Sequence, residues 1–151
     1  MRALSPLIAT VILVSVAIAV SMAFALWASN IVSVESNRDL EIISSYNEPA
    51  GDGWSVTVIV KNIGTRSTSI TRVMINHRVC DIIVEFDGPR GRASYPAGEA
   101  GYYLAPGEQA VLKFKLKSQE SCNMFFTPGQ MVEITILTST GMEYPQSIQL
   151  R

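Results

Sequence analysis

Side chains able to carry out chemistry are sparse in this sequence. One histidine, His77, falls in a predicted turn, and the cysteines at positions 80 and 122 are far apart. A zinc site needs closely spaced Cys and His ligands, and a nucleophile needs a base beside it. The acidic residues do not follow the spacing of a calcium loop, and no glycine-rich phosphate loop joins a strand to a helix. We therefore expect no enzymatic activity, no cofactor and no metal.

The two cysteines allow two interpretations. In an extracellular chain, Cys80 and Cys122 would form a disulfide whose long loop contributes about 4 kcal/mol in the chain-entropy model. Alternatively, they would be two buried thiols that behave as small hydrophobic side chains. An apolar N-terminal segment directs the chain to the membrane, and therefore we favour the disulfide.

The composition is uneven along the chain. It has 151 residues, with 48% hydrophobic and 17% charged residues and a formal net charge of -1. The near-balanced charge gives no reason to expect a nucleic-acid partner. The apolar excess is concentrated at the N-terminus, because Asp, Glu, Lys, Arg and His are all missing from Ala3 to Val34. The rest of the chain has the composition of an ordinary soluble domain.

The charge-free run predicts one long helix over residues 4–36, preceded by a short basic leader at 1–3. A membrane-spanning helix needs about 20 apolar residues, and this run is longer. Pro6 is compatible with the first helical turn, and Ser5 before it is a plausible N-cap. Small residues recur at every fourth position, which would let neighbouring helices approach closely in an apolar medium. This predicted packing stripe consists of Ala9, Leu13, Ala17, Ser21, Ala25, Ser29 and Ser33, of which only Leu13 is large.

Four roles are open to such a segment. A cleaved secretory signal peptide is disfavoured, because its apolar region is about half as long. A core helix of a soluble protein is disfavoured, because the rest of the chain is too small to cover it. A single-pass membrane anchor and a helix that later becomes the core of a polymer both fit the length.

The order of residues at the N-terminus points to a family. Arg2-Ala3-Leu4-Ser5-Pro6-Leu7-Ile8-Ala9-Thr10-Val11-Ile12 resembles the start of archaeal type IV pilins. The resemblance implies that a membrane-embedded prepilin peptidase cuts between Ala3 and Leu4, with Arg2 as the basic residue before the cut. Bacterial pilins usually carry glutamate at the position of Ile8, so this departure suits the archaeal group.

The resemblance also implies a role, partners and a location. The chain would be a structural subunit that waits in the cytoplasmic membrane and is assembled by the pilus machinery. It would join copies of itself in an extracellular filament for adhesion at the cell surface. An archaellin of the swimming filament is the alternative within this family. A membrane-anchored binding domain that does not polymerise is the alternative outside it.

The remaining residues, 39–151, alternate between short apolar-polar runs and turn signals. We expect about seven strands, at 39–46, 54–60, 69–75, 79–86, 109–117, 131–137 and 146–150. In the strand at 109–117, the pattern places Val111 with Phe114 and Leu116, and leaves Leu112 out of phase. The predicted fold class is α+β, with a long apolar helix followed by an immunoglobulin-like antiparallel β-sandwich.

The longest predicted irregular stretch is 87–101. Its side chains Arg90, Arg92 and Tyr95 form a candidate exposed loop for contact with a surface, a cell, a virus or a neighbouring subunit. A solvated connector without a binding role is the simpler interpretation, and we favour it.

Overall fold

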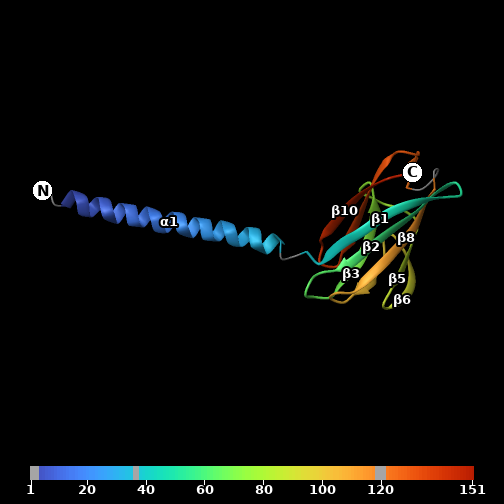
Figure 1. Cartoon of the computed structure of the whole chain (residues 1–151), viewed down its shortest axis with the longest axis horizontal. Helices are drawn as coiled ribbons and strands as arrows, with labels where there is room; N and C mark the ends of the chain where they lie inside the picture. Colours follow the sequence, from blue (N-terminus) through green and yellow to red (C-terminus); the bar gives the residue numbers. More distant parts are fainter. Residues whose placement is uncertain (1–3, 36–37, 118–121) are drawn as a thin grey trace. The chain divides into compact units, whose positions relative to one another are not determined.

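The computed structural model describes residues 4–35, 38–117 and 122–151. It separates the chain into two compact units, one of residues 1–37 and one from Arg38 to Arg151, called the β unit below. The first unit contains the helix α1 (Leu4–Glu35), and the β unit contains two antiparallel sheets (Figure 1). The predicted fold class, a long helix followed by an immunoglobulin-like β-sandwich, is confirmed.

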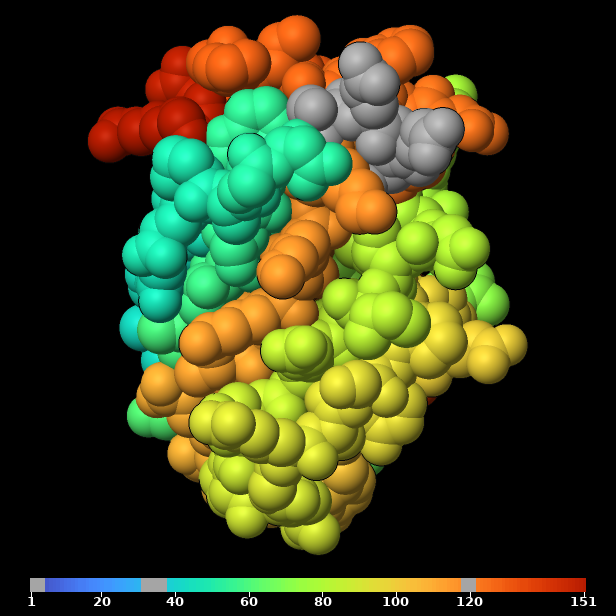
Figure 2. Space-filling model, turned by 90° about the vertical axis from the view of Figure 1, so that its right-hand side faces the viewer, coloured from blue at the N-terminus to red at the C-terminus, as the bar shows by residue number. Residues whose placement is uncertain are grey.

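The first sheet has five strands in the order β1-β2-β8-β5-β6. Figure 2 shows it crossing one face of the β unit, from teal through orange to olive and yellow. A two-residue turn at 51–52 joins the first two strands, so β1 extends past the predicted end of the strand at 39–46. The strand bounds are β1 Leu40–Ala50, β2 Gly53–Asn62, β8 Gln109–Lys117, β5 Ile83–Gly88 and β6 Gly91–Pro96.

The second sheet has the order β10-β9-β3-β4, and β7 pairs with β3 beside this path. The turn between β3 and β4 is Asn76-His77, and both residues adopt positive φ angles of 48° and 63°. Two consecutive left-handed residues are typical of a tight hairpin turn. The strand bounds are β10 Glu143–Gln149, β9 Met131–Thr138, β3 Thr68–Ile75, β4 Arg78–Val79 and β7 Tyr102–Leu104.

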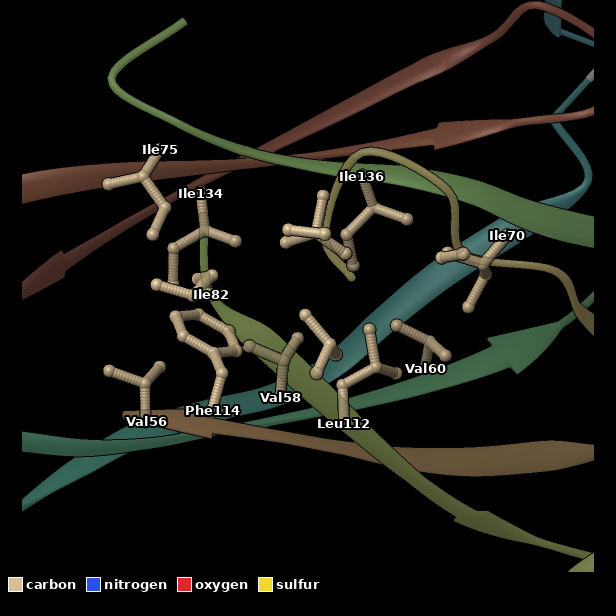
Figure 3. Close-up of a cluster of buried hydrophobic side chains, with 14 of the residues drawn as sticks. Val56, Val58, Val60, Ile70, Ile75, Ile82, Leu112, Phe114, Ile134 and Ile136 are labelled. Carbon is tan, nitrogen blue, oxygen red and sulfur yellow. The ribbon is translucent and has the colours of Figure 1, made fainter. Parts of the chain in front are cut away.

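Alternating residues of the two sheets meet in one apolar core. Val56, Val58 and Val60 of β2 point toward side chains of the opposite sheet, among them Ile134 and Ile136 of β9 (Figure 3). All five of these side chains are fully buried. Burying one such aliphatic side chain contributes roughly 1.5–3 kcal/mol, so the core is the main stabilising element of the β unit.

The phase predicted for β8 is wrong at two neighbouring positions, Val111 and Leu112. Leu112 is fully buried and lies opposite Val58 of β2, whereas Val111 lies opposite Ile59 and is only half-buried. The two-residue period of a strand places Leu112 on the same face as Phe114 and Leu116, so the expectation misapplied the alternation. The pairing with β2 agrees, because residues opposite each other across two strands share one face of the sheet.

The described residues contain ten strands where the sequence pattern suggested about seven. The run predicted as one strand at 79–86 divides into β4 and β5, which belong to different sheets. The chain crosses between the sheets at 80–82, where Cys80 and Ile82 are both buried. The stretch predicted as irregular at 87–101 contains β6, which forms a hairpin with β5.

Three sheet edges carry a proline. Pro49 lies in β1, Pro96 in β6 and Pro145 in β10, and each of these strands ends a sheet. Proline has no N–H to donate to a ladder, so it is tolerated at an edge and discourages pairing with another strand there.

Candidate functional site

The surface of α1 is apolar on every side. A segment of 26 residues, Ser5–Asn30, is long and apolar enough to cross a membrane. Its large apolar side chains from Leu7 to Trp27 are between 51% and 69% exposed, so none is covered within the helix unit. A helix that is apolar all round is stable in lipid or among other helices rather than in water. We therefore take α1 as the candidate functional site.

Four hydroxyl groups in the apolar part of α1 are satisfied by the helix itself. Thr10 donates to the carbonyl oxygen of Leu7, and Ser15 donates to that of Val11, both at 2.8 Å. The same arrangement recurs further along, where Ser21 donates to Ala17 and Ser29 donates to Leu26, at 2.7 and 2.9 Å. Because a hydroxyl without a partner is costly in an apolar medium, these internal bonds suit a helix that is withdrawn from water.

The predicted packing stripe winds around α1 instead of running along one face. A helix turns by about 100° per residue, so each four-residue step advances the row by about 40°, and from Ala9 to Ser29 it advances by about 200°. Its members from Ala9 to Ser29 are exposed, whereas the side chain of Ser33 lies outside the described residues. One straight neighbouring helix cannot follow the whole row.

The middle of the row forms a shallow depression. Ala17, Ser21 and Ala25 stay within about 80° of one another around the helix axis. Larger side chains beside them complete the depression. The residues that line it are Val14, Ala17, Ile18, Ser21, Met22 and Ala25. Small residues beside larger ones provide a hole that a side chain of another helix can fill.

An aromatic pair that the sequence analysis did not single out lies near the end of the apolar segment. The ring centroids of Phe24 and Trp27 are 5.7 Å apart. Tryptophan near the end of an apolar run is typical of a residue at the boundary between membrane and water. Trp27 lies three residues before Asn30, where the candidate membrane-spanning segment ends, and this position was the signal available in the sequence.

The predicted processing site is only partly described. Arg2 and Ala3 lie outside the described residues, and Leu4 is the first residue of α1. The position of the scissile bond therefore stays a prediction.

The cysteines form the disulfide that the sequence favoured. Cys80 and Cys122 are bonded with their Cα atoms 4.7 Å apart, and Cys80 is 3% exposed. The bond ties the segment before β9 to the crossing between β4 and β5. It closes a loop of 42 residues.

The three side chains of the candidate exposed loop lie on the β5–β6 hairpin. Arg90 is stacked over the ring of Tyr103, with its guanidinium carbon 4.3 Å from the ring centroid. Arg92 donates to Asp87 at 3.1 Å, in an exposed ion pair. Tyr95 is half-buried, with its ring centroid 5.8 Å from that of Phe86. The hairpin thus holds these side chains in contacts within the β unit.

The lone histidine lies at the surface. His77 is 75% exposed, and its Nε2 atom is 3.1 Å from Oε1 of Glu133. Within the described ranges, no group of three or more His, Cys, Asp or Glu residues is placed to hold a metal ion.

Comparisons with known proteins bear on the fold. No protein-family model and no curated protein matches the chain. Two solved structures are similar to it at 14% identity over 76% of its length. These are the apo PmoF2 PCuAC domain (TM-score 0.52, 90% of that chain) and the apo PCuAC domain from PmoF1 (TM-score 0.50, 94% of that chain). At this identity they establish a shared β fold and nothing about activity.

A further match is the archaellum periplasmic stator protein complex FlaF and FlaG from Sulfolobus acidocaldarius. Its TM-score is 0.41 and its identity 17%, over 74% of this chain and 89% of that chain. This TM-score is too low to carry a functional argument.

Proposed function

We propose that the chain is a structural subunit of an archaeal type IV pilus, with α1 forming the filament core. The observation that carries the proposal is α1 itself. It is a 32-residue helix whose described faces are all apolar and whose hydroxyls at Thr10, Ser15, Ser21 and Ser29 bond within the helix. Such a helix needs an apolar environment both before and after assembly. The lipid bilayer would provide it first, and neighbouring copies of α1 would provide it in the filament.

The depression on α1 supports a polymer over a simple anchor. An anchor needs about 20 apolar residues and no particular surface relief. Here Ala17, Ser21 and Ala25 lower the surface beside the larger Ile18 and Met22. Because the row of small residues winds around the axis, it can serve neighbours on more than one side, as a helix inside a bundle requires. Repeated head-to-tail contacts with a rotation that does not close would give an open helical filament.

The order of events follows from the N-terminal residues. Arg2 would stay on the cytoplasmic side, in line with the positive-inside tendency. Prepilin peptidase would cut between Ala3 and Leu4, and the assembly machinery would then transfer α1 from lipid into the bundle. The β unit would lie outside the cell, where an oxidising environment preserves the Cys80–Cys122 disulfide. The proposed role is therefore structural and adhesive, without an enzymatic step.

The proposal is tested by a charge placed in the depression. Ala25→Arg would put an unpaired cation between packed apolar helices, and we expect it to abolish filaments. The β unit should remain folded, which retention of the disulfide and of the β-sheet circular dichroism would show. Normal filaments from this variant would rule out a core built from α1.

Adhesion is tested separately from assembly. Deleting the gene should reduce attachment to surfaces and leave swimming intact. Loss of swimming with normal attachment would instead identify an archaellin. A monomer in detergent that keeps its N-terminus at Met1 would identify an anchored domain that does not polymerise.

A further inference from the structure

The chain enters the β unit beside the loop that follows β2. The carbonyl oxygen of Asp39 accepts a hydrogen bond from the backbone N–H of Ile63, at 3.0 Å. Leu40, the first residue of β1, pairs with Asn62, the last residue of β2. The start of β1 and the loop at 63–67 therefore lie at the same end of the sandwich, called the entry end below.

One buried side chain fixes the loop at the entry end. Asn62 is fully buried, and its Oδ1 accepts a hydrogen bond from the N–H of Gly64 at 2.9 Å. Its Nδ2 donates to the carbonyl oxygens of Arg66 and Leu104, at 2.9 and 3.0 Å. These bonds hold the loop in a conformation in which the side chain of Ile63 is 48% exposed. An apolar side chain displayed on a fixed loop can bind without further ordering of the backbone.

Two cations accompany Ile63 at the entry end. The side chains of Arg38 and Arg66 are exposed, and neither guanidinium has a hydrogen-bond or ion-pair partner in the described part of the chain. Two carboxylates lie at the same end. Glu108 is occupied by an ion pair and by a backbone N–H, and Asp39 is half-buried. The charges left for a partner are therefore mainly positive.

The covalent chain keeps the entry end close to a membrane whenever α1 spans one. The candidate spanning segment ends at Asn30, and Asp39 follows nine residues later. Nine residues reach at most about 30 Å when fully extended, and the headgroup layer is itself roughly 5–8 Å thick. A surface on such a short tether meets the lipid at an effective concentration of about 1 mM, so that even a weak contact is populated.

We propose that the entry end docks on anionic lipid headgroups while α1 spans the membrane. Ile63 would insert among the headgroups, and the guanidiniums of Arg38 and Arg66 would bind lipid phosphates. Docking would hold the β unit in one orientation before the subunit enters a filament. The docked state rests on the membrane stage of the proposed function, which a pilus subunit shares with an anchored domain. It does not depend on polymerisation.

The test uses the full chain in lipid nanodiscs in which a small fraction of the headgroups carries a spin label, which broadens the NMR signals of nearby amides. Discs of phosphatidylcholine alone are compared with discs that also contain anionic phosphatidylglycerol. We expect strong broadening at 63–66 in the anionic discs and several-fold weaker broadening in the neutral discs. Raising the salt from about 0.1 M to about 1 M should release the β unit, because the screening length shortens from about 10 Å to about 3 Å.

Arg38→Gln and Arg66→Gln should each lower the ratio of docked to free chains about fivefold, and Ile63→Asp should lower it by about tenfold. Phe125→Asp is the matched control and should leave the ratio unchanged. Phe125 is 76% exposed but lies between β8 and β9, at the opposite end of the sandwich, where β8 pairs with the first residue of β2. The amide signals of β2 show whether each variant is folded.

The proposal is overturned if both ends of the β unit broaden equally, if the neutral and anionic discs give the same broadening, or if the two arginine variants dock like the parent chain. It is also overturned if Ile63→Asp blocks filaments but leaves the broadening at 63–66 unchanged, which would indicate a contact with a neighbouring subunit. A chain that docks but forms no filaments supports the docking proposal and contradicts the filament role.

Discussion

The phenolic oxygen of Tyr144 accepts a hydrogen bond from the backbone N–H of Asp39, at 2.8 Å. The N–H of Leu40 approaches the same oxygen at 3.2 Å. Tyr144 lies in β10 and Leu40 begins β1, so one hydroxyl joins the edges of the two sheets at the first residues of the β unit. These hydrogen bonds attach the first residues of the β unit, Asp39 and Leu40, to the edge strand β10.

We expect Tyr144→Phe to lower the free energy of unfolding of the β unit by about 1–2 kcal/mol, because two partly buried N–H groups lose their acceptor. Urea unfolding followed by circular dichroism measures the change. Tyr103→Phe is the control, since Tyr103 is in contact with Arg90 through its ring and its hydroxyl has no hydrogen-bond partner among the described residues. Equal stability of the Tyr144 variant and the parent chain would show that the contact contributes nothing.

Removing the disulfide should lower the stability by a larger amount. For a loop of 42 residues the chain-entropy model gives about 4 kcal/mol, so a Cys80→Ala, Cys122→Ala chain should unfold at much lower urea. A reductant should shift the midpoint of the parent chain in the same direction and leave the double variant unchanged. A parent chain whose midpoint is insensitive to reductant would contradict the prediction.

Thr68→Val should raise the stability of the β unit by about 1 kcal/mol. The hydroxyl of Thr68 is buried without a hydrogen-bond partner in the described part of the chain, and valine has nearly the same shape. The matched control is Thr138→Val. That hydroxyl lies 2.8 Å from the hydroxyl of Thr140 and donates to Met142, so its loss should be destabilising. The prediction fails if both variants lose stability.

Ala17→Phe should reduce the yield of filaments by filling the depression on α1, while leaving the segment apolar enough to enter the membrane. Ala19→Phe adds the same ring about 200° away around the helix and outside the depression. The two variants are compared by the filament yield in sheared material, normalised to the amount of chain in the membrane. An equal loss of filaments in both would show that the depression has no special role.

The sequence predicts the class of the fold well, because its strongest signals are local. The charge-free run from Ala3 to Val34 predicts a helix, and alternating β-branched residues such as those of β2 predict strands. A disulfide between Cys80 and Cys122 follows once an extracellular location is inferred. Each of these conclusions depends on residue types within a short window or on the compartment.

The remaining features depend on contacts between distant residues. The sequence GRASYP of β6 has little strand preference, and β6 forms because its register with β5 sets Tyr95 opposite Val84. The division of the predicted strand at 79–86 depends on which sheet each half can join. The hydrogen bond between Asp39 and Ile63 has no signature in sequence, because it joins the residue before β1 to the loop after β2.

The candidate site was only partly predictable for a geometric reason. The sequence identified the small residues from Ala9 to Ser29, but a four-residue spacing does not match the helical repeat. The row therefore drifts around α1, and only its middle, at Ala17, Ser21 and Ala25, combines with Ile18 and Met22 into a depression.

The central claim, that α1 is the core of a filament, is tested most directly by electron microscopy of sheared surface material with N-terminal sequencing of the subunit. We predict thin helical filaments whose subunits begin at Leu4, with density for bundled α-helices along the axis. Filaments absent from the cell surface, and a membrane-bound monomer beginning at Met1, would contradict the claim.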